Sequence, residues 1–241
     1  MTPRLSIVLP AYNEEANIEP TLTRCISDLQ GVTEDYEILI VDDGSTDRTP
    51  GIADRLAQEN PRIRVLHNPV NLHVGLSLLV GMKAATGDIV VHNSMDYPFC
   101  LADLSRVLPL FDCHDVVLVS RTNRSAHSPW RKLTSFVHHW MVRTLFRVPF
   151  TDMNFVQAYR REVIRAVPVK AKSPAFVTPE ILIRARDLGF RIAEIRAPFL
   201  RRERGAPSYG KPRDILWTLG DMIGFWQERH SSRERSRSKS S

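Results

Sequence analysis

The chain has 241 residues, of which 43% are hydrophobic and 25% are charged. These values are typical of soluble globular proteins and exclude a disordered, collagenous or disulfide-scaffold chain. The length predicts one domain with elaborations, since a domain usually holds about 100–200 residues. Lysine and arginine outnumber aspartate and glutamate by 33 to 27, and the resulting charge of +6 favours an anionic partner such as a nucleotide, a lipid phosphate or a nucleic acid.

The cysteines and the apolar segments indicate the compartment. Cys25, Cys100 and Cys113 are odd in number and too widely spaced for a zinc motif, which fits a reducing setting. The first residues show no signal-peptide pattern. Residues 215–226, the most apolar helical stretch, are fewer than the about 20 residues that cross a bilayer and include Asp221. We expect a cytoplasmic protein, at most peripheral at a membrane, without a signal peptide or transmembrane helix.

Five short apolar runs mark the first half of the chain. β-Branched runs of this length are typical of strands buried on both faces. They predict strands at residues 5–9, 37–41, 62–66, 88–91 and 115–119, with helices between them at residues 15–29, 47–58 and 74–85. Each connection is long enough for a parallel crossover, so the pattern predicts a parallel α/β sheet.

The second half is less regular. Apolar residues at helical spacing predict an amphipathic helix over residues 128–147, with Arg131, Lys132 and Arg143 interleaved. Such a helix can pack on the sheet or lie at a membrane surface, and the sequence does not choose. We further predict a helix at 178–188, short strands at 191–194 and 197–200, a helix at 213–228, and a disordered basic Arg/Ser tail at 229–241.

Polar and acidic residues follow three of the predicted strands. Ligands of open α/β sheets bind at the carboxyl ends of the strands. The three segments there are Pro10-Ala11-Tyr12-Asn13-Glu14, Asp42-Asp43-Gly44-Ser45-Thr46-Asp47 and His92-Asn93-Ser94-Met95-Asp96. A turn with a helix cap would explain Asp47, but not Asp42 and Asp43. We therefore expect a ligand site at this edge.

Three segments together resemble a known family. They are residues 8–15 (VLPAYNEE), residues 40–49 (IVDDGSTDRT), and Asn71 followed by Gly75, Gly81, Ala85, Gly87 and Asp88. They resemble the family 2 glycosyltransferases with a GT-A fold, and their spacing is most like the polyprenyl-phosphate (dolichol-phosphate mannosyltransferase) branch. The resemblance implies a mostly parallel Rossmann-like sheet flanked by helices, with a C-terminal acceptor-side extension. It implies one domain at 1–228, in which residues 1–120 bind a nucleotide sugar and residues 121–228 form an acceptor-side half with amphipathic helices.

The resemblance also implies roles for individual residues. Those expected to bind the nucleotide are Pro10, Ala11, Tyr12, Glu14, Asp42, Asp43, Gly44 and Gly75. A divalent cation, Mg²⁺ or Mn²⁺, would stabilise the departing diphosphate. The family usually holds it with an Asp-any-Asp motif, where this chain has Ser94-Met95-Asp96, and a frequent glutamine is replaced by Pro98. Asp96 and Ser94 are thus the implied metal ligands, and the cation is expected to be weakly held, because a hydroxyl is a poorer ligand than a carboxylate.

Further implied positions lie in the second half. Arg121, Arg202, Arg204 and Lys211 would bind phosphates, with a solvated basic loop as the alternative. Asp96 is an implied catalytic residue, and Asp152 and Glu180 are candidate general bases. A lipid-phosphate acceptor is already ionised near pH 7 and needs no base, whereas a hydroxyl needs one within about 3 Å. His73 departs from the family, which has a glycine there.

Several functions follow as hypotheses. The resemblance implies an inverting glycosyltransferase that moves a sugar from a UDP- or GDP-sugar to an acceptor, either a polyprenyl phosphate or a small-molecule hydroxyl. Ser94 and Pro98 motivate an alternative, a catalytically weak relative that binds nucleotide in a regulatory or scaffolding role. The basic tail motivates a nucleic-acid binder, but no specific nucleic acid is expected. The absence of GxGxxG disfavours a dinucleotide-dependent oxidoreductase. The sequence does not decide on peripheral membrane contact or on a homo-oligomer.

Overall fold

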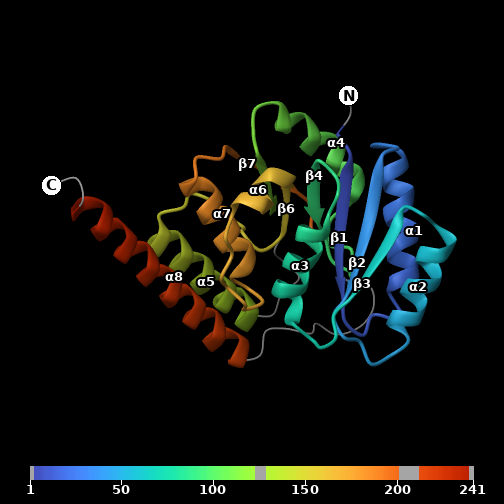
Figure 1. Cartoon of the computed structure of the whole chain (residues 1–241), viewed down its shortest axis with the longest axis horizontal. Coiled ribbons are helices and arrows are strands. Elements are labelled where there is room, and N and C mark those ends of the chain that lie inside the picture. The colour runs from blue at the N-terminus through green and yellow to red at the C-terminus, as the bar shows by residue number, and fades with distance from the viewer. Residues whose placement is uncertain (1–2, 123–128, 201–211, 239–241) are drawn as a thin grey trace.

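A seven-stranded sheet forms the centre of the computed structural model, which describes residues 3–122, 129–200 and 212–238 (Figure 1). The strand order is β3-β2-β1-β4-β6-β5-β7. The strands are β1 (Leu5–Ala11), β2 (Tyr36–Asp42), β3 (Ile63–His67), β4 (Ile89–His92), β5 (Val116–Arg121), β6 (Val156–Arg160) and β7 (Ile192–Ala197). Only β6 is antiparallel to its neighbours, β4 and β5. The predicted mostly parallel α/β sheet is confirmed.

The strands form where the sequence is apolar on both faces. Every residue of β1 and β2 is buried. Successive side chains of a strand point to opposite faces, and accordingly Leu5, Ile7 and Leu9 pack in one core cluster while Val8 packs in the other. A sheet covered on both sides needs apolar residues at consecutive positions, which explains the continuous runs.

Helices cover both faces of the sheet (Figure 1). One layer contains α1 (Ile18–Gln30), α2 (Thr49–Glu59) and α4 (Leu104–Val107), the last flanked by short 3₁₀ turns. The other contains α3 (His73–Ala84), α5 (Pro129–Phe146), α6 (Arg161–Ala166), α7 (Val177–Asp187) and α8 (Pro212–Ser238). In the described parts of the chain, no helix combines the length and apolarity needed to cross a bilayer.

Several elements differ from the sequence prediction, among them the short helices α4 and α6, for which no bounds were predicted. Strand β6 was not predicted, because Gln157 interrupts its apolar pattern, although the side chain is buried and donates to the Met153 carbonyl. Of the two short strands predicted at 191–194 and 197–200, the first corresponds to β7, which runs on to Ala197, whereas residues 198–200 form no strand. Helix α8 continues to Ser238, so the expected disordered tail is helical up to that residue. Arginine and glutamate are good helix formers, and Arg229 pairs with Asp187 of α7 at 2.8 Å.

Candidate active site

The parallel register brings the polar segments after β1, β2 and β4 to one edge of the sheet. Ala11 is aligned with Asp42, and Asp42 with His67 of β3. The backbone continues the ladder past the strands, because the Asp43 amide donates to the Ala11 carbonyl at 2.8 Å and the Asn93 amide to the Val8 carbonyl at 3.1 Å. The predicted meeting of these segments is therefore what the structure shows.

Asp42, at the end of β2, is a buried carboxylate held from two sides. Its Oδ1 accepts from the Ser45 amide at 3.1 Å, and its Oδ2 lies 2.9 Å from Nδ1 of His67. Nε2 of His67 lies 3.0 Å from Asp54 of α2. The hydrogen bond to Asp42, followed by that to Asp54, raises the pKa of His67. The imidazole, which contacts both carboxylates, fixes the orientation of Asp42.

Asp43 connects the end of β2 to the segment that follows β3. Its buried Oδ1 accepts from Asn68 Nδ2 at 3.0 Å and from the Leu72 amide at 2.8 Å. Asn68 also donates to Ser77 of α3 at 2.9 Å. Asp43 therefore shapes the loop before α3. Sequence reasoning missed His67 and Asn68, and their place directly at the end of β3 was the signal that could have found them.

The loops after β1 and β2 are tied together. The Asn13 amide donates to Ser45 Oγ at 3.0 Å, and Asn13 Oδ1 accepts from the Thr46 amide at 2.8 Å. The Glu14 amide donates to Thr49 Oγ1 at 2.8 Å. These bonds hold the segment from Pro10 to Glu14 over the β2 edge and leave the Tyr12 side chain exposed. An exposed aromatic ring here can stack on a planar base.

Gly44 and Gly75, both predicted to bind the nucleotide, are required by the structure for different reasons. Gly44 has a φ of +70°, and a Cβ there would lie 2.8 Å from the Val70 carbonyl carbon, so the turn requires glycine. A Cβ on Gly75 would lie 2.8 Å from the Ser173 carbonyl oxygen and 3.0 Å from Val177 Cγ2. Gly75 therefore allows the close approach of α3 to the start of α7, which is a packing role.

Ser94 and Asp96 lie in the turn after β4 and contact each other. Ser94 Oγ donates to Asp96 Oδ1, and Asn93 fixes the turn by accepting from the Ser94 amide at 3.0 Å. Within the described residues there is no cluster of three or more His, Cys, Asp or Glu side chains able to hold a metal ion. A hydroxyl and a carboxylate are oxygen ligands suited to Mg²⁺ or Mn²⁺, which commonly keep water or substrate phosphate in their other positions. The donor set fits a cation completed by its substrate.

Arg121 and Asp152 form a bidentate pair at the end of β5. Arg121 Nε and Nη2 lie 2.6 Å and 2.9 Å from the two carboxylate oxygens of Asp152, which is completely buried. The guanidinium also lies over the rings of Phe155 and Phe199. The pairing of this buried carboxylate indicates that Asp152 positions the arginine. A general-base role, which was expected for Asp152, is less favoured.

Glu180 is likewise engaged in the interior. Its Oε2 accepts from the Lys170 and Ala171 amides at 3.0 Å and 2.6 Å, and its Oε1 accepts from Arg184 Nε at 2.7 Å. The side chain is 1% exposed. These contacts join α7 to the segment before it and favour a structural role, in place of the base role expected from the sequence.

His73 occupies a glycine-like position at the start of α3. Its φ of +65° lies in the left-handed region, which is consistent with the glycine expected there. Its ring makes an edge-on contact with Trp217 of α8, with the centroids 5.2 Å apart. Helix α8 is thereby connected to the loop that Asp43 holds. The expected phosphate-binding residues Arg202, Arg204 and Lys211 lie outside the described residues.

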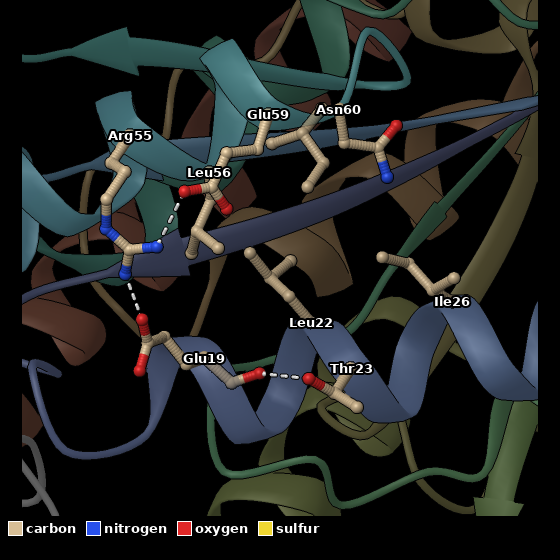
Figure 2. Close-up of a pocket in the computed structure, with 9 residues that line it drawn as sticks. Glu19, Leu22, Thr23, Ile26, Arg55, Leu56, Glu59 and Asn60 are labelled. Atoms are coloured by element: carbon tan, nitrogen blue, oxygen red, sulfur yellow. Dashed lines mark hydrogen bonds and ion pairs between the residues drawn. The ribbon is translucent and has the colours of Figure 1, made fainter.

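A concavity lies between α1 and α2, apart from the strand ends (Figure 2). It has a volume of about 420 Å³, and its apolar lining includes Leu22, Ile26 and Leu56. Arg55 bridges Glu19 and Glu59 across it. It contains none of the residues at the carboxyl ends of the strands, and we assign it no part in the site.

Comparison with known sequences decides the family. The sequence model of glycosyl transferase family 2 matches residues 6–167, which include all three strand-end segments. The chain belongs to this family.

Two curated relatives illustrate the range of similarity. The chain is 31% identical to the glycosyltransferase AglD of Haloferax volcanii over 231 residues, which are 92% of this chain and 37% of the relative. It is 27% identical to the undecaprenyl-phosphate 4-deoxy-4-formamido-L-arabinose transferase of Pseudomonas syringae, over 91% of this chain and 64% of the relative. The chain thus spans between about a third and two thirds of the length of these relatives.

Solved structures of glycosyltransferases share the fold. Glucosyl-3-phosphoglycerate synthase from Mycobacterium tuberculosis, solved with UDP, superposes with a TM-score of 0.69 at 23% identity, over 93% of this chain and 80% of that one. The mannosyltransferase PcManGT from Pyrobaculum calidifontis, solved with GDP-Man and Mn²⁺, has a TM-score of 0.62 at 22% identity, over 87% of this chain and 59% of that one. The predicted GT-A fold is confirmed.

Proposed function

We propose that the chain is an inverting glycosyltransferase that transfers a sugar from a UDP- or GDP-sugar to a phosphate-bearing acceptor such as a polyprenyl phosphate. The observation that carries this proposal is the meeting of Tyr12, Asp42 and Asp96 at one edge of the sheet, in a family 2 chain. Tyr12 and Asp42 would hold the base and ribose, with His67 fixing Asp42. A cation on Asp96 and Ser94 would supply Lewis-acid stabilisation of the leaving diphosphate.

The two candidate general bases are already paired with arginines, and this supports a phosphate acceptor. Asp152 is paired with Arg121 and Glu180 with Arg184, and both carboxylates are buried. A hydroxyl acceptor would need a base within hydrogen-bond reach, whereas an ionised phosphate can attack the anomeric carbon directly. Direct displacement inverts that carbon. Arg121, at the end of β5, would bind a phosphate of the donor or the acceptor.

The three cysteines support the compartment that we infer. None of Cys25, Cys100 and Cys113 forms a disulfide bond, which agrees with a reducing cytoplasm.

Calorimetry of nucleotide binding tests the proposal. We expect UDP or GDP to bind more tightly with Mn²⁺ than without, and Asp96→Ala to remove that difference. Asp103→Ala is the matched control, because it deletes a nearby carboxylate whose ion pair with Arg106 is a helical-turn contact at 3.6 Å. The proposal fails if neither nucleotide binds in either condition, or if Mn²⁺ acts equally on the Asp96 variant and the wild type.

One observation favours the second candidate, a catalytically weak nucleotide-binding relative. Ser94 supplies a neutral hydroxyl that donates to Asp96, where a second carboxylate would attract a cation. Under this alternative, nucleotide binds but sugar transfer is undetectable with any acceptor. Robust turnover by the unaltered chain would exclude it.

A further inference from the structure

Exposed large apolar side chains are concentrated on α5 and α8. Among the described residues, eight of the eleven belong to these helices, and Tyr12, Val70 and Leu188 are the other three. The eight, which we call the α5–α8 face, are Phe136, Val137, Trp140, Leu145, Ile215, Leu216, Ile223 and Trp226. The two helices are in contact and lie at the opposite end of the molecule from α2 (Figure 1). Grouped apolar exposure on this scale marks an interaction surface.

The exposed apolar residues recur at helical spacing. Phe136 and Trp140 are one turn apart on α5, and Leu216 and Ile223 are two turns apart on α8. Leu216 is 71% exposed and Phe136 is 65% exposed. The opposite sides of the helices are buried, with the rings of Phe146 and Phe225 5.2 Å apart. Each helix is therefore apolar on both its inner and its outer side.

The charges on the two helices are distributed unevenly. Helix α5 contains no aspartate or glutamate. On α8, Asp221 accepts from the Lys172 and Ser173 amides at 2.8 Å and 2.7 Å, and Glu228 lies 3.1 Å from Arg184. These two acids are thus engaged by groups of the protein body, whereas Asp214, in the first turn of α8, is partly exposed beside Arg213.

Basic residues accompany the apolar ones on the outer side. Arg143, Arg147 and Arg213 are exposed on or beside the two helices. Arg143 is one turn from Trp140 and Arg147 follows α5 directly, while Arg213 stands at the start of α8. The outer surface is therefore apolar and cationic.

We propose that the α5–α8 face docks on the surface of an anionic lipid bilayer. Phe136, Trp140 and Trp226 are side chains that favour the interfacial region, and arginines beside them can bind lipid phosphates. A second copy of the chain is a poorer occupant, because a two-fold interface would enclose the arginines of both copies in one contact surface. The Trp217–His73 contact joins α8 to the loop before α3, so docking would hold the strand-end site close to the bilayer.

Vesicle sedimentation with the full chain, without nucleotide or acceptor, tests docking separately from the proposed function. We expect binding to vesicles that contain phosphatidylglycerol, and weaker binding to phosphatidylcholine alone. Trp140→Ser and Leu216→Ser should each weaken binding about tenfold, because each removes a large apolar side chain from the contact. Arg143→Gln and Arg147→Gln should each lower the affinity for anionic vesicles about fivefold. Added salt should reduce the difference in affinity between these variants and the wild type.

Val70→Ser is the matched control for these substitutions. Val70 is 60% exposed and precedes α3, and it is not part of the α5–α8 face, so its substitution should leave sedimentation unchanged. Unchanged circular dichroism and nucleotide binding would show that the Trp140 and Leu216 variants remain folded. The proposal is overturned if the wild type does not sediment with anionic vesicles, or if all four variants sediment with them as the wild type does. It is also overturned if the chain self-associates without lipid and Leu216→Ser abolishes that association.

Discussion

The imidazole of His67 lies between the carboxylates of Asp42 and Asp54, 2.9 Å from the first and 3.0 Å from the second. Asp42 is thereby held in one orientation at the end of β2, directly beside the turn at Gly44. A residue outside the family motifs thus supports one inside them.

The His67 contacts predict a pH-dependent stability. The pKa of His67 is raised in the folded state, so its contribution is complete below the unfolded value of about 6.5 and is lost as pH rises through the folded value. We expect His67→Gln to lower the melting temperature more at about pH 6 than at about pH 9. Asp54→Asn should move this loss to lower pH. An equal effect of His67→Gln at both pH values would contradict the prediction.

Ser94→Asp should strengthen cation binding. It adds a second carboxylate beside Asp96 and removes a hydroxyl that now donates to it. Because added ligand charge raises affinity for a hard cation, Mn²⁺-dependent UDP or GDP binding should tighten by about one order of magnitude. Calorimetry measures this, and Ser105→Asp, which adds the same charge at an exposed position of α4, should have no such effect.

Asp152→Ala should destabilise the fold through Arg121. Removing one partner of a buried ion pair leaves an uncompensated charge, at a typical cost of about 3–5 kcal/mol. Urea unfolding should show that loss, and the double variant Arg121→Met/Asp152→Ala should recover part of it. If the single variant were as stable as the wild type and only inactive, Asp152 would have the general-base role instead.

Gly75→Ala should lower stability by about 1–3 kcal/mol, since its Cβ meets the backbone of Ser173 and overpacking costs this much. Gly51→Ala is the control, because nothing lies within 4 Å of a Cβ there. In helix α2 that change should stabilise by about 0.5 kcal/mol. Thermal unfolding compares them. If the Gly75→Ala variant were as stable as the wild type but no longer bound nucleotide, the prediction would be wrong and Gly75 would have a nucleotide-binding role.

The first half of the fold could be predicted from sequence because its strands are buried on both faces. The runs at β1, β2, β4 and β5 leave little ambiguity. Strand β7 was predicted as two strands with a break at residues 195–196, yet it runs through Ile192–Ala197, and its Glu194 is hydrogen-bonded to Ser120 and Thr151. Such bonds depend on neighbours that are distant in sequence, so no local pattern reports them.

The candidate site also contains residues that could be predicted from the sequence and residues whose roles depend on distant contacts. Asp42 and Asp96 follow apolar runs, and their spacing placed them together. The role of His67 depends on strand register and on Asp54 of a neighbouring helix. The pairing of Asp152 with Arg121 depends on the position of the segment before β6 against β5. Spacing therefore predicted which residues approach the strand ends, but not which of them are already occupied by partners.

The position of β6 has a consequence for dividing the chain. Strand β5 pairs only with β6 and β7, and β4 reaches β5 only through β6. A fragment ending at residue 120 would carry β5 without any backbone partner and would leave one edge of β4 open. The two halves are thus expected to be recovered as a complementing pair, with β6 of the second fragment inserting between strands supplied by the first. The first fragment would keep the order β3-β2-β1-β4 with β4 as an exposed edge, whereas the second should form no sheet by itself, because β6 and β7 are not neighbours.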